Sequence, residues 1–193
     1  SHKGTGTKDW NASSLVLDAL FVYAPDGTII PNIAAEVPTK ENGGLAEDLT
    51  TVTVNLQEGL LWSDGEPVTA DDIVFTWQWV VDPANASTSA SVWDPIGNIE
   101  AVSPTQAIVT FKEPSVAWFV PLTGTSYGAI IPQHILGGDD PAAASEAFLT
   151  NPIGTGPYKI DSFKENDQVI YSVNENYREP NKPYFSTVNL KGG

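Results

Sequence analysis

Four carboxylates lie close together in the sequence and are the first candidates for catalysis. They are Asp64, Glu66, Asp71 and Asp72. Two carboxyl groups about 5–10 Å apart across a cleft can hydrolyse a glycosidic bond. However, Asp64 stands in a Ser-Asp-Gly turn, and Thr69 with Asp72 forms a capping-box-like pair at a helix start. Structural roles are therefore favoured, and a carboxylate-based glycoside hydrolase is kept only as a remote alternative.

Other reactive constellations are weak in this sequence. His2 and His134 are the only histidines and there is no cysteine, so a zinc site would need carboxylates alone. We expect a structural, partly buried role for His134. Residues 154–156 read Gly-Thr-Gly, without the lysine of a phosphate loop, and no Gly-x-Ser-x-Gly elbow is present. The sequence predicts no enzyme, no cofactor and no metal site.

Aromatic side chains are better candidates for binding than for catalysis. Trp10, with Asn11 beside it, Trp93 and Tyr127 stand in loops or at the ends of predicted elements. Such residues can stack on a ligand with a large, rigid surface and a polar tip. Packing in the interior explains each of them about equally well, because Trp and Tyr are often partly buried.

Composition limits the classes of partner. The 193 residues carry 24 acidic and 9 basic side chains, for a net charge of −15. This charge argues against nucleic acids and anionic membranes as partners. Hydrophobic residues make up 41% of the chain, which indicates a globular protein. No apolar run is long enough for a transmembrane helix.

Periodicity places these residues on elements. Alternation predicts a strand over 51–56, and apolar spacing after Thr69 predicts a helix that ends at Asp82-Pro83. Further strands are expected over 98–102, 106–112, 158–162, 169–173 and 185–190, with short helices over 116–122 and 142–149, and a further helix opening at Pro132. A helix over 15–22 is also expected, after a flexible polar loop over 3–14.

Three segments together resemble a known family. Residues 61–77 read LWSDGEPVTADDIVFTW, residues 151–158 read NPIGTGPY, and residues 23–37 contain a matching Tyr-x-x-Asp-Gly turn. In order and content they resemble the family 5 extracellular solute-binding proteins, the receptors that deliver peptides, nickel or oligosaccharides to ABC importers. The resemblance covers almost the whole chain.

The resemblance implies a fold and a domain organisation. We expect an α/β fold: the mixed-sheet lobe I of a type II (cluster C) periplasmic binding protein with an inserted α/β subdomain. Residues 1–29 and 151–193 would form part of the lobe I core, and 30–150 the inserted subdomain. Full members of the family are more than twice this length, so we expect a fragment that lacks lobe II.

The resemblance also implies a function. The protein would be the non-catalytic, extracytoplasmic receptor of an ABC importer that binds an oligopeptide and delivers it to the permease subunits, with a lipid anchor in the full-length parent as one option. Oligosaccharides and metal chelates are alternative ligands, and a stand-alone carbohydrate- or peptide-binding module is an alternative function. By resemblance alone, Ser89 joins Trp10, Asn11, Trp93 and Tyr127 as a candidate ligand contact. We expect a monomer.

Overall fold

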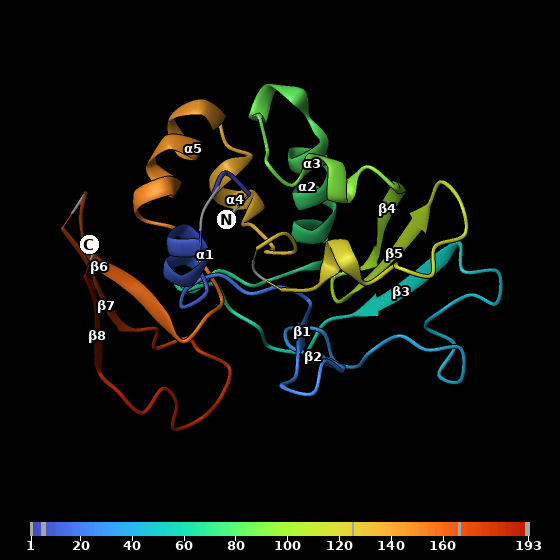
Figure 1. The fold of residues 1–193 in the computed structure, drawn as a ribbon, viewed down its shortest axis with the longest axis horizontal. Helices are drawn as coiled ribbons and strands as arrows, with labels where there is room; N and C mark the ends of the chain where they lie inside the picture. The colour runs from blue at the N-terminus through green and yellow to red at the C-terminus, as the bar shows by residue number, and fades with distance from the viewer. Residues whose placement is uncertain (1, 5–6, 125, 166, 192–193) are drawn as a thin grey trace.

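The computed structural model describes residues 2–4, 7–124, 126–165 and 167–191, with only the backbone for 7–9. Its helices and strands follow one another along the chain in this order: α1 (Thr7–Ser13), β1 (Phe21–Tyr23), β2 (Ile29–Pro31), β3 (Thr51–Asn55), α2 (Ala70–Val81), η1 (Pro83–Asn85), α3 (Ala90–Trp93), β4 (Ile96–Ser103), β5 (Gln106–Phe111), η2 (Val120–Leu122), α4 (Gln133–Leu136), α5 (Pro141–Thr150), β6 (Tyr158–Lys164), β7 (Gln168–Val173) and β8 (Thr187–Lys191). Figure 1 shows the β3–β5 strands at one end of the molecule, the β6–β8 strands at the other, and α2 between them.

The first sheet has the strand order β3-β5-β4, and α2 packs against it. Val52 and Val54 of β3 are fully buried, as the alternation predicted. α2 begins after Thr69, whose backbone N–H donates to the Asp72 carboxylate at 2.9 Å, so the predicted capping box is confirmed. The predicted strands over 98–102 and 106–112 are also confirmed: they correspond to β4 and β5, which pair antiparallel around the turn after Ser103.

The second sheet has the order β6-β7-β8, and each strand pairs antiparallel with the next. Its start is joined to the N-terminal part of the chain, because Gly156 N donates to Val16 O at 2.8 Å and Tyr158 N donates to Leu15 O at 3.0 Å. Tyr158, Tyr171 and Val16 form a small buried cluster there. Gly156 must be a glycine, since a Cβ would lie 2.7 Å from Leu15 O.

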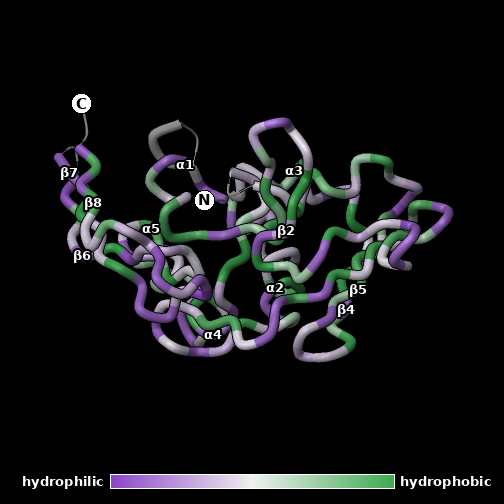
Figure 2. Tube along the Cα trace, turned by 90° about the horizontal axis from the view of Figure 1, so that it is seen from below, coloured by the Kyte–Doolittle hydropathy of each residue, from purple (hydrophilic) through white to green (hydrophobic). Residues whose placement is uncertain are grey.

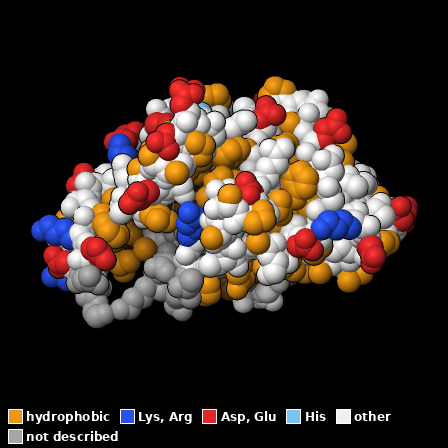
Figure 3. Space-filling model, turned by 90° about the horizontal axis from the view of Figure 1, so that it is seen from above, with side chains coloured by type: hydrophobic (Ala, Val, Ile, Leu, Met, Phe, Trp, Pro, Cys, Tyr) orange, Lys and Arg blue, Asp and Glu red, His pale blue; other side chains and the backbone are white. Residues whose placement is uncertain are grey.

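The main hydrophobic core lies between α2 and the first sheet. Its largest fully buried side chains include Trp62 and Trp93. Hydrophobic stretches of the trace lie on α2 and on strands of both three-stranded sheets (Figure 2). Acidic side chains are scattered over the face seen in Figure 3 and outnumber the basic ones there, as the net charge leads one to expect.

The predicted helix over 15–22 is wrong. Residues 16–20 are buried on every side and run through the interior without helical structure, and β1 starts at Phe21. A surface helix buries only one stripe, whereas this segment is enclosed by neighbours, with bridges from Ala19 to Ala129 and from Phe21 to Thr123. The helix lies just before it, as α1, where a flexible loop was expected.

The expected mixed sheet is also not what the described strands form. All named strand pairs are antiparallel, and the parallel pairing among the described residues is the single bridge from Phe21 to Thr123. Hairpin turns join most neighbouring strands, and such connections enforce antiparallel pairing. The expected domain boundary after residue 29 falls within β2, and the division into 1–29, 30–150 and 151–193 stays a prediction.

The helix expected over 116–122 forms only in part, whereas the helices expected after Pro132 and Asp140 are present. A 3-10 turn over Val120–Leu122 stands where a helix over 116–122 was expected. α4 follows Pro132 and α5 follows Asp140, whose carboxylate accepts from Ala143 N at 3.0 Å, so both helix starts are confirmed. Among the described residues, no helix combines the length and hydropathy needed to cross a bilayer.

Candidate functional site

The five predicted ligand contacts come from three segments of the chain. Trp10 and Asn11 lie on α1, Ser89 and Trp93 bracket α3, and Tyr127 lies in the loop between η2 and α4. The ring centroids of Trp10 and Tyr127 are 6.1 Å apart, and the two ring planes make an angle of 59°. The Trp93 indole N–H donates to the main-chain oxygen of Tyr127 at 2.8 Å. Folding therefore brings Trp10, Trp93 and Tyr127 into one aromatic cluster.

Only part of this cluster reaches solvent. Tyr127 is 40% exposed and Trp10 is partly buried, whereas Trp93 and Ser89 are fully buried. Trp93 lies behind Tyr127 and supports its backbone, so in this structure its ring has no exposed face for a ligand. Asn11 is exposed on α1. Direct ligand contact by any of the five stays a prediction, and Trp10, Asn11 and Tyr127 are the accessible members.

The loop that presents Tyr127 is fixed by its glycines. Gly124 has a φ of 72°, which favours glycine, and Gly128 N donates to Gly124 O at 2.8 Å. A Cβ on Gly128 would lie 2.8 Å from Thr123 N. Both glycines are thus needed for the tight turn that holds Tyr127 against Trp10.

Several buried polar atoms around the cluster have no hydrogen-bond partner among the described residues. They are Trp10 Nε1, Ser89 Oγ, Thr123 Oγ1 and His2 Nδ1. More than nine in ten buried polar groups are normally paired with protein or ordered water. Three of these four atoms, those of His2, Ser89 and Thr123, belong to residues that are at most 4% exposed, so they lie beneath the surface of the cluster and not on it.

The N-terminal segment packs beneath the same region. His2 Nε2 lies 2.6 Å from Ala129 O, and the His2 ring makes an edge contact with Trp93 at 6.0 Å. Thr88 N donates to His2 O at 2.8 Å. Burial lowers the pKa of His2 from 6.5 to about 4, so the ring is neutral at pH 7 and Nε2 carries the proton that it donates to Ala129.

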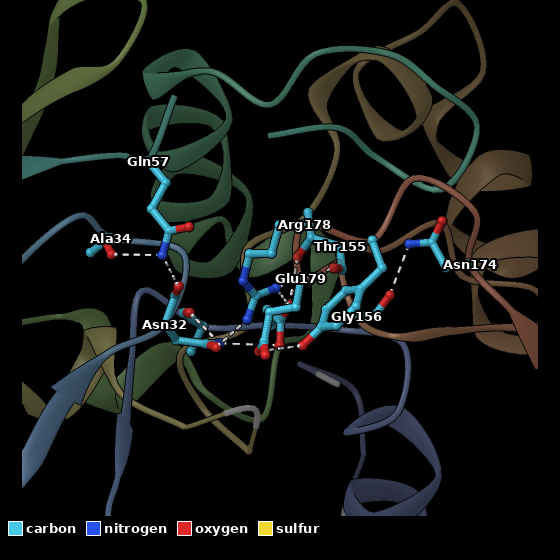
Figure 4. A network of polar contacts seen from close by, with 11 residues as sticks. Asn32, Ala34, Gln57, Thr155, Gly156, Asn174, Arg178 and Glu179 are labelled. Atoms are coloured by element: carbon cyan, nitrogen blue, oxygen red, sulfur yellow. Dashed lines mark hydrogen bonds and ion pairs between the residues drawn. The ribbon is translucent and has the colours of Figure 1, made fainter. Parts of the chain in front are cut away.

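A buried ion-pair network, which sequence reasoning missed, joins four separate segments (Figure 4). Arg178 Nη1 donates to Asp18 Oδ2 at 2.7 Å, and Thr155 Oγ1 donates to the same oxygen at 3.0 Å. Asn32 Nδ2 donates to Asp18 Oδ1 at 3.1 Å, and Arg178 Nη2 donates to Asn32 Oδ1. The Arg178 and Asp18 side chains are 12% and 11% exposed. The sequence carries one signal of this network: Asp18 is the single charged residue within the apolar run 15–22.

The carboxylates first considered for catalysis have structural partners. The buried Asp72 carboxylate accepts from Thr69 N and Gln133 N, each at 2.9 Å, and so ties the start of α2 to α4. Burial raises the pKa of Asp72, and these hydrogen bonds oppose the rise. Asp64 Oδ1 accepts from Glu66 N at 3.2 Å within its turn, and Asp64 Oδ2 lies 2.8 Å from His134 Nε2. His134 therefore has the structural contact expected of it.

No group of three or more His, Cys, Asp or Glu side chains among the described residues is placed to hold a metal ion. The accessible chemistry of the region is instead that of aromatic faces, hydroxyls and N–H donors. Such a surface can hold a ligand by stacking and neutral hydrogen bonds.

Comparison with known proteins identifies the family. The family model described as "Bacterial extracellular solute-binding proteins, family 5 Middle" matches residues 28–192. The chain is 31% identical over 170 residues to Protein XP55 of Streptomyces lividans, a match that covers 88% of this chain and 29% of XP55. It is 28% identical over 159 residues to the oligopeptide-binding protein AppA of Bacillus subtilis, over 81% of this chain and 28% of AppA.

Solved structures share the fold. The B. subtilis AppA structure, in complex with a nonapeptide, superposes with a TM-score of 0.85 at 21% identity and covers 99% of this chain and 36% of that one. NikZ of Campylobacter jejuni, in complex with Ni(L-His), gives a TM-score of 0.80 at 26% identity, over 93% of this chain and 34% of NikZ. The α/β fold thus matches part of the periplasmic-binding-protein structures, and the chain spans about a third of the length of the relatives it matches. It belongs to family 5 of the bacterial extracellular solute-binding proteins, a family of binding proteins rather than of enzymes.

Proposed function

We propose that this chain is part of the substrate-binding component of an ABC importer, which captures a solute outside the cytoplasmic membrane and delivers it to the permease subunits. Family membership supports this role. We propose an oligopeptide as the solute, because AppA is an oligopeptide-binding protein and its structure holds a nonapeptide. A metal chelate of the kind in the NikZ complex is the alternative.

The observation that carries the proposal is the partly exposed pair of Trp10 and Tyr127, with the exposed Asn11 beside Trp10 on α1. Peptide side chains can pack on the exposed Tyr127 ring, and the exposed Asn11 amide can donate to a peptide carbonyl oxygen. No ion pair is needed for either contact. The pair therefore suits a ligand that is recognised through neutral main-chain groups.

The organisation of the longer protein is part of the proposal. Residues 1–29 and 151–193 would contribute to the core of lobe I and 30–150 to its inserted subdomain, with the solute held between this lobe and a second one. The protein would act as a monomer at the outer face of the membrane, with a lipid anchor as one way to stay there. Closure of two lobes on the solute would exclude water.

The test uses the family-length protein that contains these residues. Isothermal titration with a defined nonapeptide pool measures affinity for the parent and three variants. We expect Tyr127→Ala to weaken binding by about tenfold or more, as for a central aromatic contact. Asn11→Ala removes the exposed amide and should weaken binding by roughly fivefold.

Tyr23→Ala is the matched control, because Tyr23 is 52% exposed on β1 and lies outside the cluster. Equal affinities for all four proteins would refute the assignment of the site. Binding of Ni(L-His) but not of peptide would replace the proposed solute. If residues 1–193 alone bound the peptide as tightly as the longer protein, a stand-alone binding module would replace the two-lobed receptor.

A further inference from the structure

Residues 2–4, which we call the N-terminal strap, join two segments that carry the aromatic cluster. The main-chain oxygen of His2 accepts hydrogen bonds from Thr88 N at 2.8 Å, Thr88 Oγ1 at 2.9 Å and Ser87 Oγ at 3.2 Å. These donors lie just before α3, the helix that ends at Trp93. The strap is therefore fixed to one side of the cluster by its backbone.

The side chain of His2 reaches the other side of the cluster, residues 126–131, which we call the Tyr127 loop. His2 Nε2 donates to Ala129 O at 2.6 Å, two residues after Tyr127. The same ring lies edge-on to Trp93, with ring centroids 6.0 Å apart, and Trp93 donates its indole N–H to Tyr127 O. One side chain thus contacts the backbone that presents Tyr127 and the ring that supports it.

The pocket around His2 does not suit a positive charge. Its lining residues from α2, α4, α5 and the adjoining segments are all uncharged, and the one charged lining residue is Lys3 of the strap itself. Lys3 Nζ donates to Ser145 Oγ at 3.1 Å and lies 5.5 Å from the Trp79 ring centroid. A second cation beside Lys3 is disfavoured by like-charge repulsion.

The acidic residues of the elements packed around His2 have other partners or face solvent. Backbone N–H groups or basic side chains hold the carboxylates of Asp18, Asp72, Asp82, Asp94 and Asp140. Asp71 on α2 and Glu146 on α5 are exposed, and His134 on α4 contacts Asp64. Among the described residues, no carboxylate is therefore placed to compensate a charge on His2.

We propose that His2 is a positioning residue for the Tyr127 loop: its neutral side chain holds the loop to the 87–93 segment, and its protonation frees the loop. The proton is taken up by Nδ1, which is buried without a hydrogen-bond partner among the described residues. An imidazolium is solvated far better by water than by an apolar pocket, so the strap leaves the pocket when it forms. The consequence for solute binding rests on the proposed function, whereas the release of the loop does not.

The pH range of the release follows from the two states of His2. Burial lowers the pKa of His2 from 6.5 to about 4, the hydrogen bond to Ala129 O opposes this, and the ammonium group at the chain start adds to it. Docking of the strap is thus most favourable above pH 6.5 and weakens as the pH falls towards about 4. By this linkage, the equilibrium constant for opening should rise about 20-fold between pH 7 and pH 5.

The test measures opening by hydrogen–deuterium exchange and mass spectrometry on the family-length protein. Exchange of the 86–93 and 126–131 segments is compared at pH 5 and pH 7, after correction for the intrinsic exchange rate at each pH. His2→Gln keeps an N–H donor for Ala129 O but does not titrate. His2→Phe keeps a ring but removes the donor. His134→Gln is the matched control, because it removes the other histidine of the chain.

We expect opening of both segments to rise about 20-fold from pH 7 to pH 5 in the parent and in His134→Gln. His2→Gln should keep the protection of the parent at pH 7 and lose most of this pH dependence. His2→Phe should open about fivefold or more often at pH 7, because Ala129 O loses its donor. The same pH dependence in His2→Gln as in the parent would overturn the proposal, and this comparison holds even if His2→Phe does not fold.

The solute separates this proposal from the proposed function. A saturating nonapeptide that contacts Tyr127 should slow the opening of the Tyr127 loop, because binding and docking of the strap are then linked. If the nonapeptide binds without slowing this opening, while His2→Gln still removes the pH dependence, the role of His2 is supported and the solute site at Tyr127 is refuted.

Discussion

Removing Arg178 should destabilise the fold far more than removing an exposed lysine from a comparable ion pair. Arg178 and Asp18 are about nine-tenths buried and 2.7 Å apart. Arg178→Met leaves a buried carboxylate without its cation, which costs about 3–5 kcal/mol. The exposed pair of Lys112 and Asp94, 3.0 Å apart with side chains 54% and 76% exposed, is the matched control. Lys112→Met should cost about 1 kcal/mol or less.

Urea denaturation followed by tryptophan fluorescence measures both free energies of unfolding, and the six tryptophans provide the signal. At roughly 2–4 °C per kcal/mol for a chain of this size, Arg178→Met should lower Tm by about 6–20 °C. Asp18→Asn and the double variant complete a thermodynamic cycle, in which the double variant should cost clearly less than the sum of the singles. If Arg178→Met costs no more than Lys112→Met, or if the two sites are additive, the network does not join the segments as described.

Three further changes test other parts of the structure. The lowered pKa of His2 means that its stabilisation is complete above pH 6.5 and is lost as the pH falls towards about 4; urea titrations should show a loss of roughly 3 kcal/mol that is absent in His2→Gln. Gly128→Ala should cost about 1–3 kcal/mol by thermal unfolding, since its Cβ would meet backbone at 2.8 Å, whereas Gly138→Ala, whose nearest new contact is 3.8 Å away, should cost less. Thr76→Val should cost about 1–3 kcal/mol in urea, because the buried Thr76 hydroxyl accepts from Ile131 N at 3.0 Å; an unchanged midpoint would contradict that role.

Local patterns were sufficient to predict α2, the individual strands β3, β4 and β5, and the strands β6 and β7. Thr69 and Asp72 carry a capping signal that depends on neighbours in sequence, and Val52 and Val54 alternate in a strand that buries one face. These signals need no knowledge of distant residues. The same is true of α5, which starts at Asp140 and Pro141.

The helix prediction for residues 15–22 was wrong because their apolar spacing suits a helix as well as it suits a buried extended segment. What decides its structure is enclosure by residues distant in sequence, including Ala129 and Thr123. Asp18 was hidden for the same reason, since its partners Arg178 and Thr155 lie 160 and 137 residues away. A buried ion pair between segments has no local signature.

The sequence pointed to part of the aromatic cluster, and its role in binding stays a prediction. Trp10 and Tyr127 were chosen as aromatic residues at element ends, and folding does bring their rings together. Trp93 was chosen on the same ground, but α3 turns its ring into the core, where it is fully buried. Sequence position alone does not distinguish an aromatic residue that offers a stacking surface from one that supports it from behind, whereas the burial of each side chain in the structure does.

The most direct test of the account is a crystal structure of the family-length protein with a bound oligopeptide. The account predicts peptide density in contact with Trp10 and Tyr127, within about 4 Å of their rings, with Trp93 behind them and not touching the peptide. Density for the peptide elsewhere, with Trp10 and Tyr127 open to solvent or covered by another part of the protein, would contradict it.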